Sequence, residues 1–496
     1  MTAASDVRWV GYPLAPAPLA TLRAARRRDP QARLVDERGT AISFGPIARL
    51  RETARAAWLA FTDAVVAMAV GLCTSSHRPR HTPGVPGPGP VVLLLPVLPD
   101  LSHTFVYREV LALLRRRPDW QIVALEKNVT APVHPEAAEL LQHTEFLAPR
   151  GITGRAIAML AALGTAGGRA LFALYRADAG GGVRDLLGKN PLRDPRHPAN
   201  AFLLAARLAA GGRKPRHIHV YGSTYSANVA MGAAMLLGVP FSISSYVDFE
   251  FPYAHKLLVD KLHRATFFRV VTDFCATRLG ELLAHEAPPR ERIPTLLLGL
   301  DLARWQERAV PPRCGVLLSA ARLVPKKGLH LMPPALAELR SRGIAFRWRV
   351  AGDGPELARL QALCAEHGVV DAVDFLGACD NAKVRREILA ADAAVLPCVV
   401  AADGERDGIP IFLCEAMALG VPVVTTPISG IPELVTDGDS GLLCKPGSVG
   451  ALADALQRIC TDHALADALA ARGRAVVHER LDVDRIAAEL VRRIEA

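Results

Sequence analysis

The chain beyond residue 90 opens with short apolar runs that alternate with amphipathic stretches. The runs of this first set lie at residues 91–97, 121–126, 217–222 and 241–246. Short runs that are apolar throughout, separated by helical sequence, are typical of parallel strands whose sheet is covered on both faces. The pattern predicts a doubly wound α/β domain over residues 91–310, with a helical insertion near residues 150–216.

A second set of apolar runs begins after residue 310. They lie at residues 315–320, 347–352, 373–377, 393–398, 422–427 and 441–447. No long-range repeat links them, so we interpret them as crossovers of one sheet and not as a solenoid. Residues 311–496 are therefore predicted to form a second Rossmann-like domain. Two such domains in tandem place a cleft between the carboxyl ends of their strands, where ligands bind.

Residues 1–90 are predicted to form a mostly helical extension. Its most apolar stretch, residues 56–73, spans about 18 residues and contains Asp63, whereas a membrane span needs about 20 mostly uncharged ones. We expect this stretch to pack on the protein or to lie at a membrane surface. The Pro/Gly-rich run at residues 77–90 predicts a linker to the main body.

Positive charge is concentrated in two segments of this chain of 496 residues. The formal net charge is +10, but residues 1–90 carry +6 and residues 150–216 carry +9, so the remainder is acidic. The bias suggests an anionic partner such as membrane headgroups or a lipid phosphate, unless these are simply solvated helix faces. A nucleic-acid partner is disfavoured because aromatic residues make up only 5% of the chain.

The cysteines and the N-terminus bear on the compartment. Nine cysteines are scattered without a CxxC pair, and no Cys/His spacing resembles a zinc site. No basic region precedes an apolar run at the start, so a secretory signal is not expected. We expect reduced thiols in a cytoplasmic protein that can lie at the inner face of the membrane.

Two cationic residues follow the first apolar run of the second domain. Neither domain has a GxGxxG or GxxxxGK[ST] motif, which argues against a dinucleotide dehydrogenase and a P-loop enzyme. Instead, Arg322 and Lys327 flank the loop ARLVPKKG. A guanidinium fork and a mobile ammonium suit a diphosphate whose charge grows as it leaves, although such side chains are more often solvated surface.

Two acids eight residues apart follow in ERDGIPIFLCEAMALG. We expect a turn at Gly408, Ile409 and Pro410 and a helix that starts near Pro410. The free N–H groups at the start of this helix would bind an anion. Glu415, one turn into this helix, could accept hydrogen bonds from ribose hydroxyls, and Asp407 could point at a sugar ring. The alternative is a capping role for Asp407 and a surface position for Glu415.

In this context the chain resembles the family 4 retaining glycosyltransferases of GT-B fold, in particular the branch for colanic acid and other exopolysaccharides. The resemblance runs from residue 91 to the C-terminus. It is carried, in order, by SHTFVYREV, LLSAARLVPKKG, VAGDGPE, VDFLG, LPCVVAADGERDGIPIFLCEAMALGVPVVTT, SGIPELV and SGLLCKPG. The resemblance implies two Rossmann-like domains facing a central cleft.

The resemblance also implies roles for the donor side. Asp407 would lie by the transferred sugar and Glu415 would contact the nucleotide ribose, while Arg322 and Lys327 would neutralise the donor diphosphate. Gly408 and Ile409 match turn positions whose amides approach the donor, and Pro410 starts the helix. Gly354 would belong to a small-residue loop beside the cleft, with the base near Leu376 and Gly377.

The first domain departs from the family pattern. The segment HIHVYG keeps His219, but Tyr221 stands at the second histidine place and Tyr246 stands where a loop histidine is expected. Tyrosine can donate a hydrogen bond but cannot become cationic near neutral pH. We treat Tyr246, Asp248 and Ser102 as candidate acceptor-side residues.

The sequence therefore predicts a retaining glycosyltransferase that moves a hexose from a nucleotide diphosphate sugar to a saccharide or a polyprenyl-linked acceptor. Exopolysaccharide or cell-envelope glycan synthesis would be its setting. No cofactor and no metal are expected, since no DxD-like carboxylate pair stands in a loop. The main alternative is a degenerate GT-B protein that binds nucleotide sugar or a partner enzyme without transfer. A GT-B phosphorylase or epimerase is a third, weaker interpretation.

Overall fold

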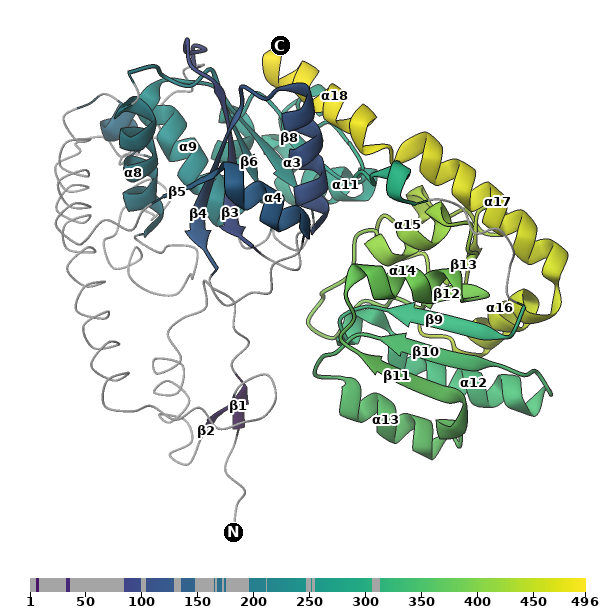
Figure 1. Cartoon of the computed structure of the whole chain (residues 1–496). Coiled ribbons are helices and arrows are strands. Elements are labelled where there is room, and N and C mark those ends of the chain that lie inside the picture. The colour runs from purple at the N-terminus through teal and green to yellow at the C-terminus, as the bar shows by residue number, and fades with distance from the viewer. Residues whose placement is uncertain are drawn as a thin grey trace.

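The computed structural model contains two parallel β-sheets (Figure 1). It describes residues 6–8, 33–35, 84–99, 104–128, 135–147, 165, 167–171, 174, 196–210, 212–246, 251, 255–305 and 313–496. Most of the predicted extension and of the basic insertion, together with Ser102 and Asp248, therefore lie outside the described residues. Two short strands of the extension, β1 (Asp6–Arg8) and β2 (Arg33–Val35), pair in parallel.

The first large sheet has the order β5-β4-β3-β6-β7-β8, and all of its strands are parallel. Its strands are β3 (Val91–Leu98), β4 (Gln121–Lys127), β5 (Thr144–Phe146), β6 (His217–Tyr221), β7 (Phe241–Ser245) and β8 (Phe268–Val270). Its helices are α3 (Thr104–Arg116), α4 (Pro135–His143), α8 (Arg196–Ala210), α9 (Tyr225–Leu237), α10 (His255–Arg264) and α11 (Asp273–Leu283). Central strands β6 and β7 are buried along their whole length, as their position in a covered sheet requires.

The second sheet repeats the same order as β11-β10-β9-β12-β13-β14. Its strands are β9 (Val316–Ala320), β10 (Arg347–Ala351), β11 (Val373–Gly377), β12 (Ala393–Leu396), β13 (Val423–Thr425) and β14 (Leu442–Leu443). Its helices are α12 (Met332–Ser341), α13 (Leu357–Glu366), α14 (Asn381–Leu389), α15 (Ile411–Ala418), α16 (Val449–Thr461) and α17 (His463–Arg480). In Figure 1, α14 and α15 lie on one side of this sheet and α12 and α13 on the other. The predicted pair of doubly wound sheets is confirmed.

Side-chain caps fix several helix starts. Thr272, Asp380, Ser448, Asp462 and Asp482 each accept a hydrogen bond from a backbone N–H in the first turn of the helix that follows. Such caps satisfy amide groups that have no partner within the helix. The last of these helices is α18 (Val483–Glu495). Short 3-10 turns occur at Ala284–Glu286, Arg290–Arg292, Leu302–Arg304, Pro325–Lys327, Leu329–Leu331, Val370–Ala372 and Ile431–Glu433.

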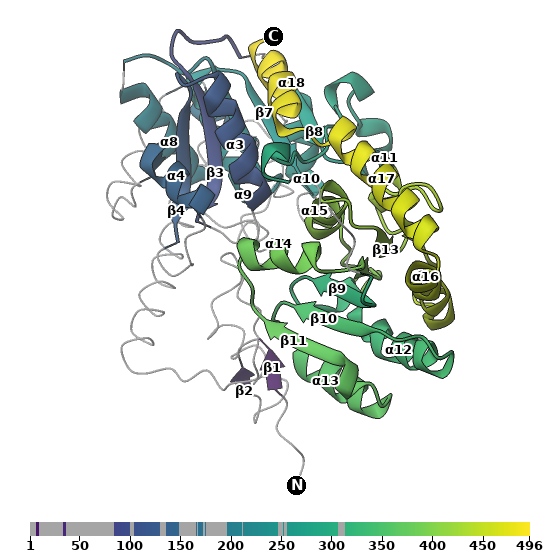
Figure 2. The same cartoon turned by 45° about the vertical axis from the view of Figure 1, so that its right-hand side comes forward.

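The chain crosses between the two domains twice. The forward crossing at Leu300 and the return crossing at residues 481–483 are hydrogen-bonded to each other, from Leu300 N to Leu481 O over 2.6 Å and from Val483 N to Leu300 O over 3.1 Å. Figure 2 shows α17 running from the second domain toward α18, which lies beside the first sheet. Buried side chains of α18, including Leu490, belong to the first hydrophobic core. The last helix thus completes the first domain, although the predicted boundary placed everything after residue 311 in the second.

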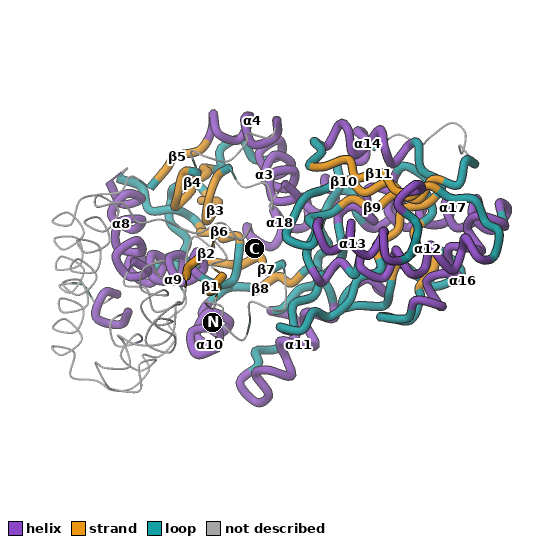
Figure 3. Tube along the Cα trace, turned by 90° about the horizontal axis from the view of Figure 1, so that it is seen from below, coloured by secondary structure: helices purple, strands orange, loops and turns teal. Residues whose placement is uncertain are grey.

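The domains also meet through a helix terminus. The carboxylate of Glu433 in the second domain accepts hydrogen bonds from Asp273 N over 2.8 Å and Phe274 N over 2.7 Å, at the start of α11. A carboxylate at a helix N-terminus interacts favourably with the positive end of the helix dipole. Figure 3 shows the two sheets side by side in this arrangement. Among the described residues, no helix combines the length and the apolar character that crossing a membrane requires.

Candidate functional site

The carboxyl ends of the second sheet collect most of the predicted donor residues. Arg322 follows β9, Gly354 follows β10, Leu376 and Gly377 end β11, and Asp407 follows β12. Strand order reverses between β9 and β12, and ligands of open α/β sheets bind outside the carboxyl ends at such a switch point. The topology therefore places the candidate site where the first domain faces this edge.

A cavity of about 320 Å³ lies between the domains at this edge. The second domain lines it with Lys327, Asp407, Gly408, Ile409 and Pro410, among others. From the first domain come Phe105, Tyr246, Val271 and Thr272. The structure thus brings together a cation, a carboxylate, the start of α15 and the candidate acceptor-side tyrosine.

Lys327 and Asp407 are paired on the cavity wall. Lys327 Nζ lies 2.8 Å from Asp407 Oδ2, and Lys326 Nζ lies 3.9 Å from Oδ1 of the same carboxylate. The Cys398 thiol donates to Asp407 Oδ2 over 3.7 Å, and burial raises the pKa of this thiol, so it stays a neutral donor. Asp407 therefore holds the Lys327 ammonium in place at the cavity.

Gly328 allows the loop that carries Lys327 to pack closely against the segment after β12. Gly328 has φ +66°, and a Cβ built there would lie 1.8 Å from the carbonyl oxygen of Pro397. The neighbouring Val399 N donates to Lys326 O over 3.0 Å, which ties the loop to the segment after β12. Gly354 lies under the same loop, where a Cβ would approach Leu323 O to 2.4 Å. Close backbone approach thus positions the cation.

Alanine at Gly328 is expected to destabilise the second domain. Gly343 is the matched control, because it has a similar φ of +74° but no atom within 4 Å of a built Cβ. Both substitutions introduce left-handed strain, but only Gly328→Ala also forces a clash, which typically costs about 1–3 kcal/mol more. Calorimetric unfolding of the two variants checks this difference. Equal destabilisation would show that the close approach at Pro397 is not needed.

The other predicted donor residues do not line the cavity, namely Arg322, Gly354, Leu376, Gly377 and Glu415. Arg322 is exposed in the loop between β9 and the turn Pro325–Lys327, and within the described chain no ion pair involves it. Leu376 and Gly377 lie two strands away from β9, at the edge of the sheet. Leu376 O accepts from Lys383 Nζ over 3.4 Å, and Gly377 O accepts from Gly352 N over 2.8 Å. They flank the cavity along the sheet edge and do not line it.

Glu415 is buried and not a surface carboxylate. Its Oε1 accepts a hydrogen bond over 3.1 Å from Nη1 of Arg108, which comes from α3 of the first domain. Burial raises the pKa of Glu415, and the Arg108 guanidinium opposes this shift. The ion pair joins residues 307 positions apart in the chain, so the sequence pattern gave no signal for it.

A second buried ion pair supports the first-domain side of the cavity. Glu109 accepts two hydrogen bonds from Arg269 Nη1, over 2.7 and 2.8 Å, and the Arg269 side chain is 0% exposed. Arg269 also donates to the carbonyl oxygens of Leu296 and Leu297, next to cavity residues. Arg108 and Glu109 both belong to the motif SHTFVYREV. Their place in this motif was the one sequence signal that pointed to these two residues.

Tyr246 lines the cavity on its first-domain side. Its ring lies edge-on to Phe105 at 4.9 Å and parallel to Tyr221 at 6.2 Å between centroids. Its backbone oxygen would lie 3.7 Å from a Cβ built on Gly408, so the turn after Asp407 comes close to it. The structure thus places Tyr246 on the cavity wall, close to the turn after Asp407.

His219, which the sequence retains, lies deep below the cavity. It is fully buried, with its two ring nitrogens within hydrogen-bond distance of Ser242 and Ser244. Burial lowers its pKa well below the ordinary histidine value, and burial lowers that of His217 to about 3. These histidines are therefore neutral members of the core. Across the described part of the chain, no group of three His, Cys, Asp or Glu side chains could hold a metal ion.

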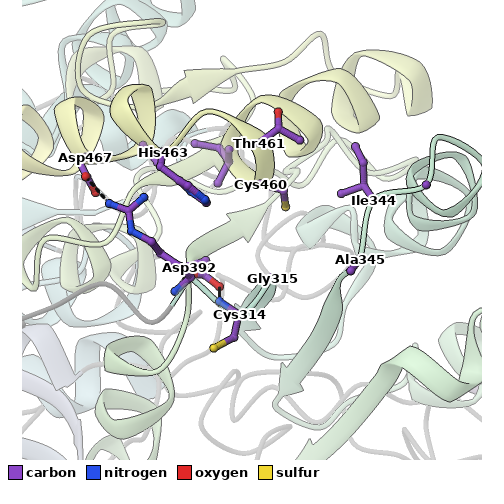
Figure 4. A pocket seen from close by; sticks show the side chains of 13 residues that line it. Cys314, Gly315, Ile344, Ala345, Asp392, Cys460, Thr461, His463 and Asp467 are labelled. Carbon is purple, nitrogen blue, oxygen red and sulfur yellow. Dashed lines mark hydrogen bonds and ion pairs between the residues drawn. The ribbon is translucent and has the colours of Figure 1, made fainter.

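A separate cavity of about 450 Å³ lies at the opposite end of the second sheet. Cys314, Asp392, Cys460 and His463 line it, as Figure 4 shows. Asp392 accepts hydrogen bonds from Cys314 N and Val316 N, each over 2.8 Å, which anchors the start of β9. This cavity is at the amino ends of the strands, away from the switch point, and contains none of the predicted site residues.

Comparisons with known proteins identify relatives of this chain. Residues 306–476 match the family model described as glycosyl transferases group 1. The glycosyltransferase WcaL of Salmonella typhimurium, named for colanic acid biosynthesis, is 30% identical over 394 residues, which covers 76% of this chain and 92% of that protein. The amylovoran biosynthesis glycosyltransferase AmsK of Erwinia amylovora is 40% identical over 143 residues, or 29% of this chain and 35% of that protein.

Solved structures confirm the fold. The crystal structure of HepE from Anabaena in complex with UDP-glucose superposes with a TM-score of 0.57 at 16% identity, covering 82% of this chain and 99% of that one. The likeness extends over both sheets, as the GT-B interpretation requires. The match to WcaL over most of its length, together with the family model and this fold, shows that the chain belongs to the group 1 glycosyl transferase family, as a glycosyltransferase of GT-B fold.

Proposed function

We propose that this chain is a retaining hexosyltransferase that uses a nucleoside diphosphate sugar as its donor. The observation that carries the proposal is the cavity between the domains, where Lys327 and Asp407 stand beside the start of α15. Support for the donor class also comes from HepE, whose structure contains UDP-glucose. WcaL and AmsK are named for colanic acid and amylovoran biosynthesis, which supports a role in exopolysaccharide or cell-envelope glycan synthesis.

The diphosphate would bind between Lys327, Arg322 and the amide groups at the start of α15. Pro410 precedes this helix, and its carbonyl accepts the first hydrogen bond of the helix, from Leu413 N over 3.0 Å. The helix itself therefore provides no acceptor for the N–H groups of Ile411 and Phe412, which could bind a ligand. Free N–H groups and the helix dipole favour an anion here. Glu415, one turn further, would accept hydrogen bonds from the ribose, with the base toward Leu376 and Gly377.

Transfer would depend on stabilising the leaving diphosphate. The negative charge on the leaving group grows as the bond to the sugar breaks, and preorganised cations such as Lys327 stabilise that charge. Asp407 would orient both the ammonium and the sugar ring. Tyr246, on the facing wall, would help to place the acceptor hydroxyl on the same face as the departing phosphate, which gives retention. Closure of the two domains would exclude water. Because protein cations neutralise the diphosphate, we propose that no metal or cofactor is needed.

The acceptor would be a saccharide or a polyprenyl-diphosphate-linked sugar bound by the first domain. The net charges of +6 on residues 1–90 and +9 on residues 150–216 support an anionic surface as the partner. We propose a cytoplasmic protein that contacts the inner face of the membrane peripherally through these segments. Most of both segments lies outside the described residues, so this proposal rests on their composition.

Donor turnover tests the proposal. The protein is incubated with UDP-, GDP- and ADP-hexoses and an extract of lipid-linked saccharides, with and without EDTA. We expect release of nucleoside diphosphate with one donor class, no loss with EDTA, and a product whose anomeric NMR coupling matches the donor. Binding without release would favour the alternative of a binding-only protein. Release with the opposite anomeric configuration would contradict retention.

A further inference from the structure

Glu415 and Arg108 form an ion pair across the cleft between the two domains. Arg108 Nη1 donates to Glu415 Oε1 over 3.1 Å, and only 4% of the Arg108 side chain and 11% of the Glu415 side chain are exposed. Across the described residues, no other hydrogen bond reaches the Glu415 carboxylate. One carboxylate oxygen is thus held by the first domain, and the other has no hydrogen bond from the described residues.

Arg108 is itself held from two further sides. Its Nε donates to Glu136 Oε1 on α4 over 3.4 Å, and its guanidinium lies 5.8 Å from the centroid of the Trp305 ring. Glu136 Oε1 also accepts from Arg304 Nη1 over 3.0 Å. The negative charges of Glu415 on α15 and Glu136 on α4 thus alternate with two positive charges. These belong to Arg108 on α3 and to Arg304, which follows the domain crossing. Such a network fixes the position of the Arg108 fork.

The electrostatics of Glu415 depend on this fork. Burial raises the pKa of Glu415, the Glu136 carboxylate raises it further, and Arg108 lowers it. On the same helix, burial raises the pKa of the Cys414 thiol to about 12, so this neighbour is neutral. Helix α17 packs on α15 through Gly473, where a built Cβ would lie 3.4 Å from Cε of Met417. Arg108 is thus the cation that lowers the pKa of Glu415 against the effect of burial.

We propose that Arg108 is a positioning residue that prepares Glu415 to bind the nucleotide ribose. The proposal rests on the proposed function, in which Glu415 accepts the ribose hydroxyls. Arg108 holds Oε1, and among the described residues no hydrogen bond reaches Oε2, so the carboxylate presents a fixed acceptor to the ligand. Because Arg108 belongs to the first domain, ribose binding on the second domain is favoured only while the two domains are closed.

Nucleoside diphosphate binding tests this proposal. Calorimetry with UDP, GDP and ADP first identifies the tightest ligand of the wild-type protein, and its affinity is then measured from pH 5.5 to 8.5. The variants are Arg108→Gln, which removes the charge, and Arg108→Lys, which keeps it. Removal of the cation raises the pKa of Glu415, so the carboxylate becomes protonated as the pH falls. We expect the Gln variant to lose about tenfold or more at pH 6, since a hydrogen bond to a charged group contributes about 1.5–3 kcal/mol.

The pH profile and a ribose probe separate positioning from folding. We expect the Gln variant to recover affinity at high pH and the Lys variant to follow the wild-type profile. The 2′- and 3′-deoxy analogues of the ligand should bind more weakly than the ligand to wild type, and the Gln variant should lose this discrimination at pH 6. If wild type binds with discrimination and Arg108→Gln has an unchanged profile, only this inference is overturned. A pH-independent loss in both variants would assign Arg108 a structural role and also overturn it. If wild type binds no nucleoside diphosphate, the proposed function fails and the inference with it.

Discussion

Replacing Lys327 with alanine is expected to lower kcat for sugar transfer by about 10²–10³-fold with the donor that the wild-type protein uses. The ammonium is fixed at the cavity by a 2.8 Å pair with Asp407, and 15% of its side chain is exposed. A charge held in place before the reaction stabilises a growing negative charge without reorganisation in the transition state. Steady-state kinetics with separately determined donor affinity would show a larger loss in kcat than in binding.

Two controls make the Lys327 result specific. Lys445→Ala removes an exposed lysine of the same domain that does not line the cavity, and we expect it to leave kcat unchanged. Lys327→Arg keeps the charge but changes its geometry, so it should recover part of the rate. Wild-type turnover by Lys327→Ala would show that the leaving diphosphate is stabilised elsewhere.

Replacing Arg269 with methionine is expected to destabilise the first domain by about 3–5 kcal/mol. The substitution leaves the buried Glu109 carboxylate uncompensated, and it also removes the donors to Leu296 O and Leu297 O. An unpaired charge in the interior costs more than the net stabilisation of the intact pair. Calorimetry would show the unfolding transition of the first domain at a lower temperature.

An exposed pair in the same domain is the matched control. Arg207 Nη2 lies 2.8 Å from Glu145 Oε2, but the Arg207 side chain is 59% exposed, so Arg207→Met should cost less than about 1 kcal/mol. A double variant, Arg269→Met with Glu109→Leu, should be more stable than Arg269→Met alone, because it removes the stranded carboxylate. Equal destabilisation by the two arginine substitutions, or no recovery in the double variant, would contradict this account.

Local patterns predicted the parts of the fold that depend on local sequence. The apolar runs at residues 91–97 and 315–320 became β3 and β9, the first strands of the two sheets. Because parallel strands end at one edge, the loops that carry Lys327 and Asp407 could be expected to meet, and the cavity contains both. The turn before α15 could be predicted because glycine permits turn conformations and proline fixes φ at a helix start.

The remaining features depend on how the two domains meet. Nothing in the neighbourhood of Glu415 indicates a partner 307 residues away on α3. Glu433 belongs to the motif SGIPELV, which gives no sign of a capping role. Only the structure, in which the two domains meet, shows that its carboxylate accepts hydrogen bonds at the start of α11. The α18 pattern is amphipathic, which predicts a helix on some core without saying which one. The sequence therefore predicted the helices and strands and the sheet edge at which the site lies. The contacts between the two domains could be seen only in the folded structure.

The position of α18 has a consequence for biosynthesis. This helix supplies buried side chains to the core around α3, yet it follows the whole second domain in the chain. Domains generally fold from the N-terminus as synthesis proceeds. Here the core around α3 stays incomplete until the second domain has been synthesised and α18 has left the ribosome. A nascent chain therefore carries an incomplete first domain while the second domain is made, and a stop codon ahead of α18 damages the domain that was made first.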